Sequence, residues 1–536
     1  MSASESASQE PELAHDHEGI RYLSMLLALL SGALSVLAFA PFEIWPLLPL
    51  CYGIFFAGVY RCTSPRQVFL FGYLFGLGYF GAGIYWIYYS LHLFGGAIAA
   101  LAVAGTFAFV AFLALFPAFF GRIALRLKTQ TGTIASGINY PSAAVWFLLV
   151  APAVWMLSEW IRSWLFTGFP WLTTGYATLH SPVAGYAPIG GVFLNTLLIA
   201  ICSGAVGLFL TMFLTRRLHR GAALAAVLFV AVIFAGGTLL SKIQWTTVSG
   251  EPVSVVMVQG NIKQELKFND SLVPDSLDIY SSLSLSRETV PDLIIWPESA
   301  IPAFFSDVQG WIDGFVEEIN ERGTTVISGG FLSNDDFTEY YNAIKVLGGS
   351  EEQVYTKRHL VPFGEFMPFR SLRSFLARFV AIPLSDLSPG HGPVKPMQVN
   401  GVYYGMSICY EDLFGNEMKV QLPQANVLIN VSNDAWFGDS TAPHQHQEIA
   451  AMRALEFQRP MLRVTNTGIS SMISRYGKIV VEGPQAEAVA IDVEVVPRTG
   501  STPFVVVGNW LAVILALLIV VWRWCANSWF NSNAKG

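Results

Sequence analysis

Long apolar runs with few charged residues restrict this chain to folds that have a membrane-embedded part. A helix needs about 20 apolar residues to cross the hydrocarbon of a bilayer. Candidate runs lie at 22–40, 44–60, 67–90, 96–121, 142–161, 189–214, 222–240 and 503–523. Charged residues make up only 13% of the chain, roughly half their share in an ordinary soluble protein. The sequence therefore predicts a polytopic α-helical domain with eight transmembrane helices.

The basic residues predict the orientation of these helices, because Lys and Arg in short loops stay on the cytoplasmic side. They cluster after the even-numbered runs, as Arg216, Arg217 and Arg220 do after 189–214. Both termini are therefore expected in the cytoplasm and the long segment after the seventh run on the outer face. The expected parts are a polar tail 1–20, helices one to seven in 21–243, an extracytoplasmic domain 244–500, helix eight in 501–524 and a tail 525–536.

Residues 244–500 have an ordinary polar content and contain short runs of β-branched and aromatic residues. Strands are expected at Val253–Val258, Leu293–Trp296, Thr325–Ser328, Ala343–Leu347, Val402–Ile408, Val427–Val431 and Met461–Thr465. Helices are expected around Ser306–Arg322 and Gln445–Phe457. Strands that alternate with helices predict an α/β domain whose sheet is buried by helices. Two apolar segments, 301–305 and 363–369, are either core or arms that dip toward lipid.

Cys409 is the one cysteine of five that falls in the expected outer domain, so it has no partner there for a disulfide. An unpaired thiol in an oxidising compartment is either a small buried hydrophobe or a reactive group. The expected strand 402–408 ends directly at Cys409. Strand ends are where an α/β scaffold usually holds catalytic groups, which favours the reactive interpretation.

Two further ionisable residues follow expected strands. Glu298 comes after Leu293–Trp296, and Lys357 comes after a short run at 355–356. A thiol attacks a carbonyl only as thiolate, so it needs a base and gains from a nearby cation. Glu298 suits the base and Lys357 the cation that stabilises an oxyanion. A further carboxylate, Glu365 or Glu411, would orient the lysine or relay protons.

Taken together, three segments resemble the Glu-Lys-Cys arrangement of the nitrilase superfamily. They are Trp296-Pro-Glu298-Ser, Thr356-Lys357 with Pro362-Phe-Gly-Glu365, and Cys409-Tyr-Glu-Asp. The apolar runs on both sides, with the segments 258–261, 430–438 and 463–468, narrow the resemblance to the apolipoprotein N-acyltransferases. This resemblance implies an αββα sandwich for the outer domain. Phe268 departs from the family pattern, which has Trp there.

The resemblance also implies a two-step acyl transfer. Cys409, with Glu298 as general base and acid, attacks an acyl ester of a phospholipid, and phosphatidylethanolamine is the expected donor. Lys357 and a backbone N–H face the oxyanion. The resulting thioester then acylates the α-amine of the diacylglyceryl-cysteine of an apolipoprotein. Tyr410 is expected to support the site, and lipid or substrate contacts are expected from Phe268, Trp296 and Trp436.

This reaction requires no metal or organic cofactor, and the expected location is the bacterial inner membrane with the catalytic domain in the periplasm. His359, His444 and His446 do not suggest a metal site, because the i, i+2 spacing falls at an expected helix start. The net charge of −7 gives no sign of a nucleic-acid partner. The alternatives are a membrane-tethered amidase that uses the same three residues, and a transporter or scaffold whose outer domain only binds.

Overall fold

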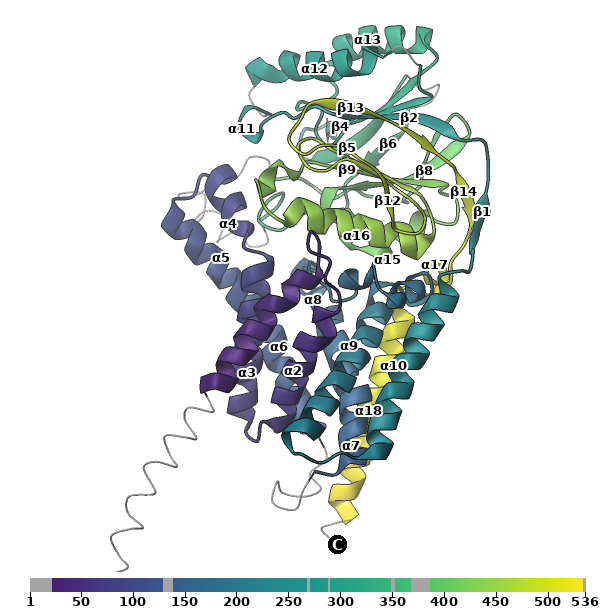
Figure 1. The fold of residues 1–536 in the computed structure, drawn as a ribbon. Helices are drawn as coiled ribbons and strands as arrows, with labels where there is room; N and C mark the ends of the chain where they lie inside the picture. Colours follow the sequence, from purple (N-terminus) through teal and green to yellow (C-terminus); the bar gives the residue numbers. More distant parts are fainter. Residues whose placement is uncertain are drawn as a thin grey trace, which may run out of the picture.

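The long apolar helices gather at one end of the molecule, and the sheets, with the helices that cover them, lie at the other (Figure 1). The computed structural model describes residues 22–128, 138–267, 270–287, 290–348, 352–367 and 386–533. The helical end carries the apolar runs, and the other end carries the segment that was expected to form an α/β domain. The two parts of the chain therefore fold into separate layers that meet along one face.

Five helices of the described residues are long and apolar enough to cross a membrane. They are Ala99–Arg126 (α5 and α6), Tyr140–Arg162 (α7, η4 and α8), Pro182–Leu214 (η7 and α9), Arg220–Leu240 (α10) and Trp510–Trp529 in α18. A sixth is a pair, α3 (Pro65–Gly83) and the segment Ile87–Phe94, bent by 62°. Tyr22–Ala38 and α2 (Leu47–Arg61) are shorter apolar helices. A helical domain with several apolar helices is therefore confirmed, and the full count of eight spans stays a prediction.

The last expected span, 503–523, is not one helix. Helix α17 (Pro503–Val507) ends at Gly508, and α18 (Trp510–Asn533) begins two residues later. Gly508 has a φ of 59°, in the left-handed region that favours glycine. The turn is fixed from the sheet end of the molecule, where Asn416 Oδ1 accepts the N–H of Asn509 at 3.2 Å. The crossing helix therefore starts at Trp510, later than hydropathy alone indicates.

At the other end of the molecule the described residues form two six-stranded sheets and a two-stranded ribbon. The first sheet has the order β13 (Val489–Val495), β2 (Val253–Gln259), β3 (Leu293–Ile295), β4 (Thr325–Ser333), β5 (Tyr340–Leu347), β6 (Val354–Thr356). The second has the order β12 (Ile479–Glu482), β11 (Ser471–Ile473), β10 (Met461–Thr465), β9 (Val427–Ser432), β8 (Val402–Ile408), β7 (Met397–Val399). Strands β1 (Thr246–Val248) and β14 (Arg498–Gly500) form the ribbon. All seven expected strands are present.

The two sheets pack face to face, and helices cover both outer faces. Val255 and Met257 of the first sheet share a buried cluster with Met406 and Ile408 of the second. Helices α12 (Val273–Leu285) and α13 (Gln309–Glu321) cover the first sheet, and α16 (Ala442–Phe457) lies between the second sheet and the helical bundle (Figure 1). The expected αββα layering is therefore present, with its α16 layer resting on the membrane helices.

Trp296 is part of the core and does not contact lipid, so that expectation is wrong. Its ring is fully buried against Tyr280 and Phe315, and its Nε1 donates to Ser284 Oγ at 2.9 Å. Of the two alternatives for 301–305, the structure supports core packing, since Ile301 and Phe305 are buried in the same cluster. Helices α12 and α13 cover this side, at the end of the molecule away from the bundle (Figure 1). Phe268 lies outside the described residues.

Candidate active site

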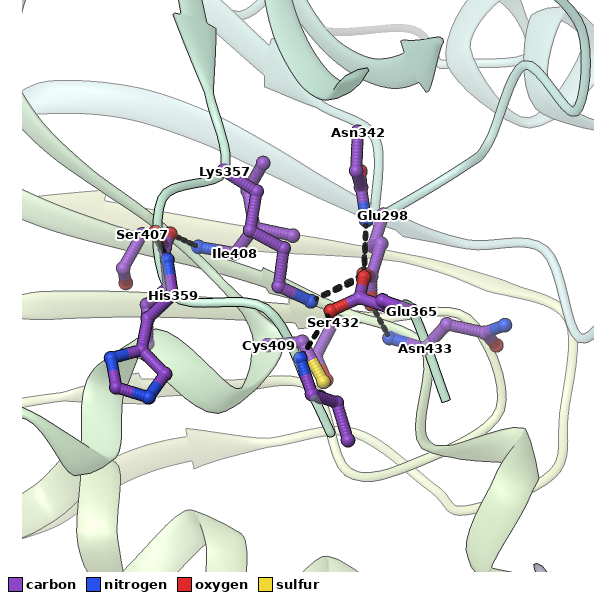
Figure 2. A network of polar contacts seen from close by, with 12 residues as sticks. Glu298, Asn342, Lys357, His359, Glu365, Ser407, Ile408, Cys409, Ser432 and Asn433 are labelled. Atoms are coloured by element: carbon purple, nitrogen blue, oxygen red, sulfur yellow. Dashed lines mark hydrogen bonds and ion pairs between the residues drawn. The ribbon is translucent and has the colours of Figure 1, made fainter. Parts of the chain in front are cut away.

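Glu298, Lys357 and Cys409 meet in the space between the two sheets. Each follows the end of a strand: β3 for Glu298, β6 for Lys357 and β8 for Cys409. Lys357 Nζ lies 3.3 Å from Glu298 Oε1, and both side chains are buried. Figure 2 shows the sulfur of Cys409 and the ammonium of Lys357 pointing into the same space. The structure therefore brings together the three residues that the sequence singled out, which lie 111 positions apart or less along the chain.

Lys357 is held between two carboxylates. Its Nζ lies 2.8 Å from Glu365 Oε1 and 3.3 Å from Glu298 Oε1. Asn342 Nδ2 donates to both carboxylates, at 2.7 Å to Glu298 Oε1 and 3.2 Å to Glu365 Oε1. Burial by itself lowers the pKa of Lys357, but the charges of Glu298 and Glu365 raise that pKa well above its ordinary value. Lys357 is therefore a cation at neutral pH.

Glu298 is fixed by donors from three directions. Its Oε2 accepts the backbone N–H of Asn433 at 2.8 Å, and its backbone carbonyl accepts from Lys267 Nζ at 3.0 Å. Burial lowers the pKa of Lys267 to about 7. Ser299, the next residue, has a φ of 50° and turns the chain sharply after the strand end. These contacts fix both the backbone and the carboxylate of Glu298, whose charge acts on the thiol of Cys409.

Cys409 sits in a backbone conformation that non-glycine residues rarely adopt. Its φ is 51°, at the point where β8 passes into the short helix η9 (Cys409–Leu413). Such a conformation costs about 1–3 kcal/mol and persists only where neighbours enforce it. Burial raises the pKa of the Cys409 thiol, the charge of Glu298 raises it further, and Lys357 opposes them. The resting residue is therefore a thiol, which has to lose its proton as it attacks.

The raised pKa of Cys409 predicts how the free enzyme reacts with iodoacetamide. Only the thiolate reacts, so the rate should rise about tenfold per pH unit and still be rising at pH 9–10, where an ordinary thiol with a pKa near 8.5 levels off. Cys525 is exposed, so Cys525→Ser is the background for the measurement, while Cys51, Cys62 and Cys202 are buried. A plateau below pH 8.5 would contradict the expectation.

Glu411 links the loop that carries Lys357 to the loop that carries Cys409. Its Oε1 accepts the backbone N–H of Arg358 at 2.7 Å, and its Oε2 accepts that of Ile408 at 2.7 Å. Tyr355 donates to the same carboxylate at 2.9 Å. Of the two carboxylates considered for orienting the lysine, Glu365 contacts Lys357 directly. Glu411 instead holds the backbone next to Lys357 and the backbone next to Cys409.

Tyr410 and Trp436 lie where the sheets meet the bundle. Tyr410 donates its hydroxyl to the carbonyl of Gly168 at 3.0 Å, which fastens the catalytic loop to the helical part. The backbone carbonyl of Trp436 accepts a hydrogen bond from Ser90 Oγ at 2.8 Å. The Trp436 ring lies 6.1 Å from the ring of Phe94, which belongs to the bent helix pair. The Trp436 ring is partly exposed, so its expected role as a lipid contact stays a prediction.

Asn342 and Lys267 contact the acidic residues of the site, and the sequence did not single them out. Asn342 is a buried polar residue in the middle of β5, between apolar neighbours. A buried amide in a strand has to find partners, so its position was a usable signal. Lys267 lies next to Phe268, and nothing in its surroundings sets it apart from a surface lysine until the fold buries it.

Residues 279–503 match the family model of carbon-nitrogen hydrolases. With the acid, lysine and cysteine assembled between its sheets, this part defines the chain as an enzyme of the carbon-nitrogen hydrolase superfamily, joined to a bundle of apolar helices. Residues 31–205 match the apolipoprotein N-acyltransferase N-terminal domain. Because relatives of this family are 37–40% identical over 93% of the chain, the chain belongs to the apolipoprotein N-acyltransferase family, and it is a membrane protein.

The relatives of the chain cover almost its whole length. The apolipoprotein N-acyltransferase of Methylococcus capsulatus is 40% identical over 93% of this chain and 95% of its own. That of Nitrosomonas europaea is 37% identical over 93% of this chain and 97% of its own. That of Coxiella burnetii is 36% identical over 90% of this chain and 96% of its own. The similarity therefore includes the helical bundle as well as the catalytic domain.

Proposed function

We propose that this protein transfers a fatty acyl chain from a phospholipid to the α-amino group of the N-terminal diacylglyceryl-cysteine of apolipoproteins. The observation that carries the proposal is the buried pair of Glu298 and Lys357 beside the Cys409 thiol, with Glu365 bound to the lysine. The names of the relatives supply the substrate class. Phosphatidylethanolamine is the proposed donor.

In the first step, Glu298 takes the proton of the Cys409 thiol while the sulfur attacks the ester carbonyl of the phospholipid. Two N–H groups of Lys357 point at Glu298 and Glu365 in the described part of the chain, and the third is the donor proposed for the oxyanion. The C–O bond then breaks, and Glu298 returns its proton to the departing lysophospholipid oxygen. A thioester on Cys409 remains.

In the second step, the amine of the apolipoprotein attacks the thioester carbonyl. Glu298 takes a proton from the attacking nitrogen, and the tetrahedral intermediate collapses with cleavage of the C–S bond. The proton passes to the sulfur, so the thiol of Cys409 is restored and the amide product leaves. Glu298 therefore acts in turn as base and acid in both steps, and Glu365 keeps Lys357 oriented between them.

The proposed topology has eight spans, with the catalytic domain on the periplasmic face of the inner membrane and both termini in the cytoplasm. The five long helices, the bent pair and the two shorter apolar helices supply eight segments. The described helices that start at Tyr22 and end at Asn533 have these ends on the side of the bundle away from the sheets (Figure 1). The domain limits proposed are 21–243 and 244–500, with the eighth span starting at Trp510.

The test is to incubate the purified protein in detergent with acyl-labelled phosphatidylethanolamine and to measure its intact mass. The expected result is an acyl adduct on Cys409 that hydroxylamine removes and that a diacylglyceryl-cysteine peptide discharges to the N-acylated peptide. Phosphatidylglycerol in a parallel reaction tests the choice of headgroup. No adduct, or an adduct that only water discharges, would overturn the proposal in favour of a membrane-tethered amidase.

A further inference from the structure

Four charged residues are buried together behind the backbone of Cys409. They come from four elements: Asp412 from η9, Asp434 from η11 (Asp434–Phe437), His446 from α16 and Arg463 from β10. At most 2% of any of these residues is exposed. None of them has a part in the proposed acyl transfer, and buried charges are expensive to keep unless they are paired and hydrogen-bonded.

Both ring nitrogens of His446 face carboxylate oxygens. Nδ1 lies 3.2 Å from Asp434 Oδ1, and Nε2 lies 3.0 Å from Asp412 Oδ1. A neutral imidazole has a single N–H, so one of its lone pairs would face a carboxylate, whereas both nitrogens of an imidazolium donate. Burial and Arg463 lower the pKa of His446, but Asp412 and Asp434 outweigh them and raise it. His446 is therefore a cation.

The charges of the cluster balance. Arg463 Nη2 lies 2.7 Å from Asp434 Oδ2, and its Nη1 lies 3.5 Å from Asp412 Oδ2. Two cations thus face two carboxylates, which offsets much of the cost of burying each of them. A neutral residue at position 446 would leave one negative charge without compensation inside the protein.

Two side chains contact the carbonyl oxygen of Cys409: His446 of the cluster, and Asn430, which is bound to Arg463 of the cluster. His446 Nε2 lies 3.3 Å from that oxygen. Asn430 Nδ2 donates to the same oxygen at 3.1 Å, and Asn430 Oδ1 in turn accepts from Arg463 Nη1 at 2.7 Å. The peptide group of the residue with the left-handed backbone is therefore held from two sides by groups that the buried charges keep in place.

The helical bundle fixes His446 from the opposite side. The indole of Trp171 lies 5.5 Å from the His446 ring, and its Nε1 donates to Gln445 Oε1 at 2.7 Å. Trp171 also packs on Trp86, at 4.9 Å, next to the bend between α3 and the segment Ile87–Phe94. The position of His446 therefore depends on the contact between the catalytic domain and the membrane helices.

We propose that His446 is a positioning residue for acyl transfer: held between Asp412 and Asp434, it fixes the carbonyl of Cys409 and so directs the sulfur toward Glu298 and Lys357. The inference rests on the proposed role of Cys409 as nucleophile. His446 touches neither lipid nor amine in this scheme. Its loss should therefore slow the chemical step and leave substrate binding unchanged.

The test compares His446→Gln with His446→Asn. Both variants remove the charge, but the glutamine amide reaches the place of Nε2 and keeps a donor for the Cys409 carbonyl, while the shorter asparagine reaches only the place of Nδ1. Misplacing a reacting group by about 1 Å can cost about 10²-fold in rate. The single-turnover acylation rate should therefore fall about 10²-fold in His446→Asn and about tenfold or less in His446→Gln, with unchanged KM for phospholipid. His444→Gln, two positions away on the same helix and partly exposed, is the matched control.

Equal rates in the two variants, or losses that follow only their thermal stability, would overturn the inference. If both His446 variants fail to fold, Asn430→Ser removes the second donor to the same carbonyl and leaves the four charges in place. A wild-type rate in Asn430→Ser would also contradict the positioning role of His446.

If the wild-type protein forms no acyl adduct, the proposed function has failed. The rate at which Cys409 reacts with iodoacetamide then compares His446→Gln with His446→Asn without any lipid. A faster reaction of Cys409 in His446→Gln than in His446→Asn would still support the positioning role of His446.

Discussion

Replacing Cys409 with alanine is expected to lower kcat for acyl transfer by about 10⁶-fold, as loss of the nucleophile does in other covalent enzymes. The sulfur is the atom that carries the acyl group in the proposed thioester, so the adduct should disappear altogether. Alanine keeps the Cβ and removes one partly buried atom, so membrane insertion and thermal stability should change little. The measurements are intact mass after incubation with labelled phospholipid, and N-acylation of a diacylglyceryl-cysteine peptide.

Two variants control for the loss of a cysteine as such. Cys525 is exposed at the far end of α18, so Cys525→Ser should keep full activity. Cys409→Ser offers a weaker oxygen nucleophile, and any ester formed on it should resist the neutral hydroxylamine that removes a thioester. Acyl transfer by Cys409→Ala above about 1% of the wild-type rate would show that the acyl group does not pass through Cys409.

Replacing Glu298 with glutamine is expected to lower the acylation rate by about 10³–10⁴-fold, near the upper range for loss of a general base. The amide keeps the size of the side chain but cannot take the proton of the Cys409 thiol. Its NH₂ group would also face a donor, because Asn342 and Lys357 point at one oxygen and the N–H of Asn433 at the other. Single-turnover acylation with labelled phospholipid measures the effect.

Glu417→Gln provides the matched control for Glu298→Gln. Glu417 pairs with His359, its side chain is 53% exposed, and it lies outside the group around Lys357. This variant should acylate at the wild-type rate. If Glu298→Gln kept a rate within tenfold of wild type, another group would have to serve as the base.

The positions of Glu298, Lys357 and Cys409 were predictable from the sequence because each lies directly after an apolar strand. Local sequence placed each of them near the end of a strand, where α/β scaffolds usually hold catalytic groups. The resemblance of the three segments to the Glu-Lys-Cys arrangement of the nitrilase superfamily grouped them into one site. The strands themselves were also predictable, since the central ones are buried on both faces and appear as continuous apolar runs. Strand β3, apolar and buried at all three positions, is the clearest case.

Other features depend on partners far away in the chain, and local sequence does not contain them. Glu411 and Glu365 were equivalent candidates, and only the fold shows that Glu365 contacts Lys357. Trp296 was assigned to lipid because an apolar aromatic looks the same in a core as at a membrane surface. The break at Gly508 is invisible to hydropathy, because α17 is as apolar as the span that follows it.

Helix α16 bears on how this protein can be divided into parts. Every residue from Gln445 to Phe457 is buried, between the second sheet and the bundle. Its polar side chains have partners in the bundle: Glu456 Oε1 accepts the N–H of Val192 at 2.6 Å, and Gln445 accepts from Trp171. A water-soluble fragment cut out at residues 244 and 502 would expose this face and remove the partners of Glu456 Oε1 and Gln445 Oε1 in the bundle. The bundle thus covers a face of α16 that a fragment would leave open, and truncation for crystallisation or inhibitor screening would first require a redesigned outer face for this helix.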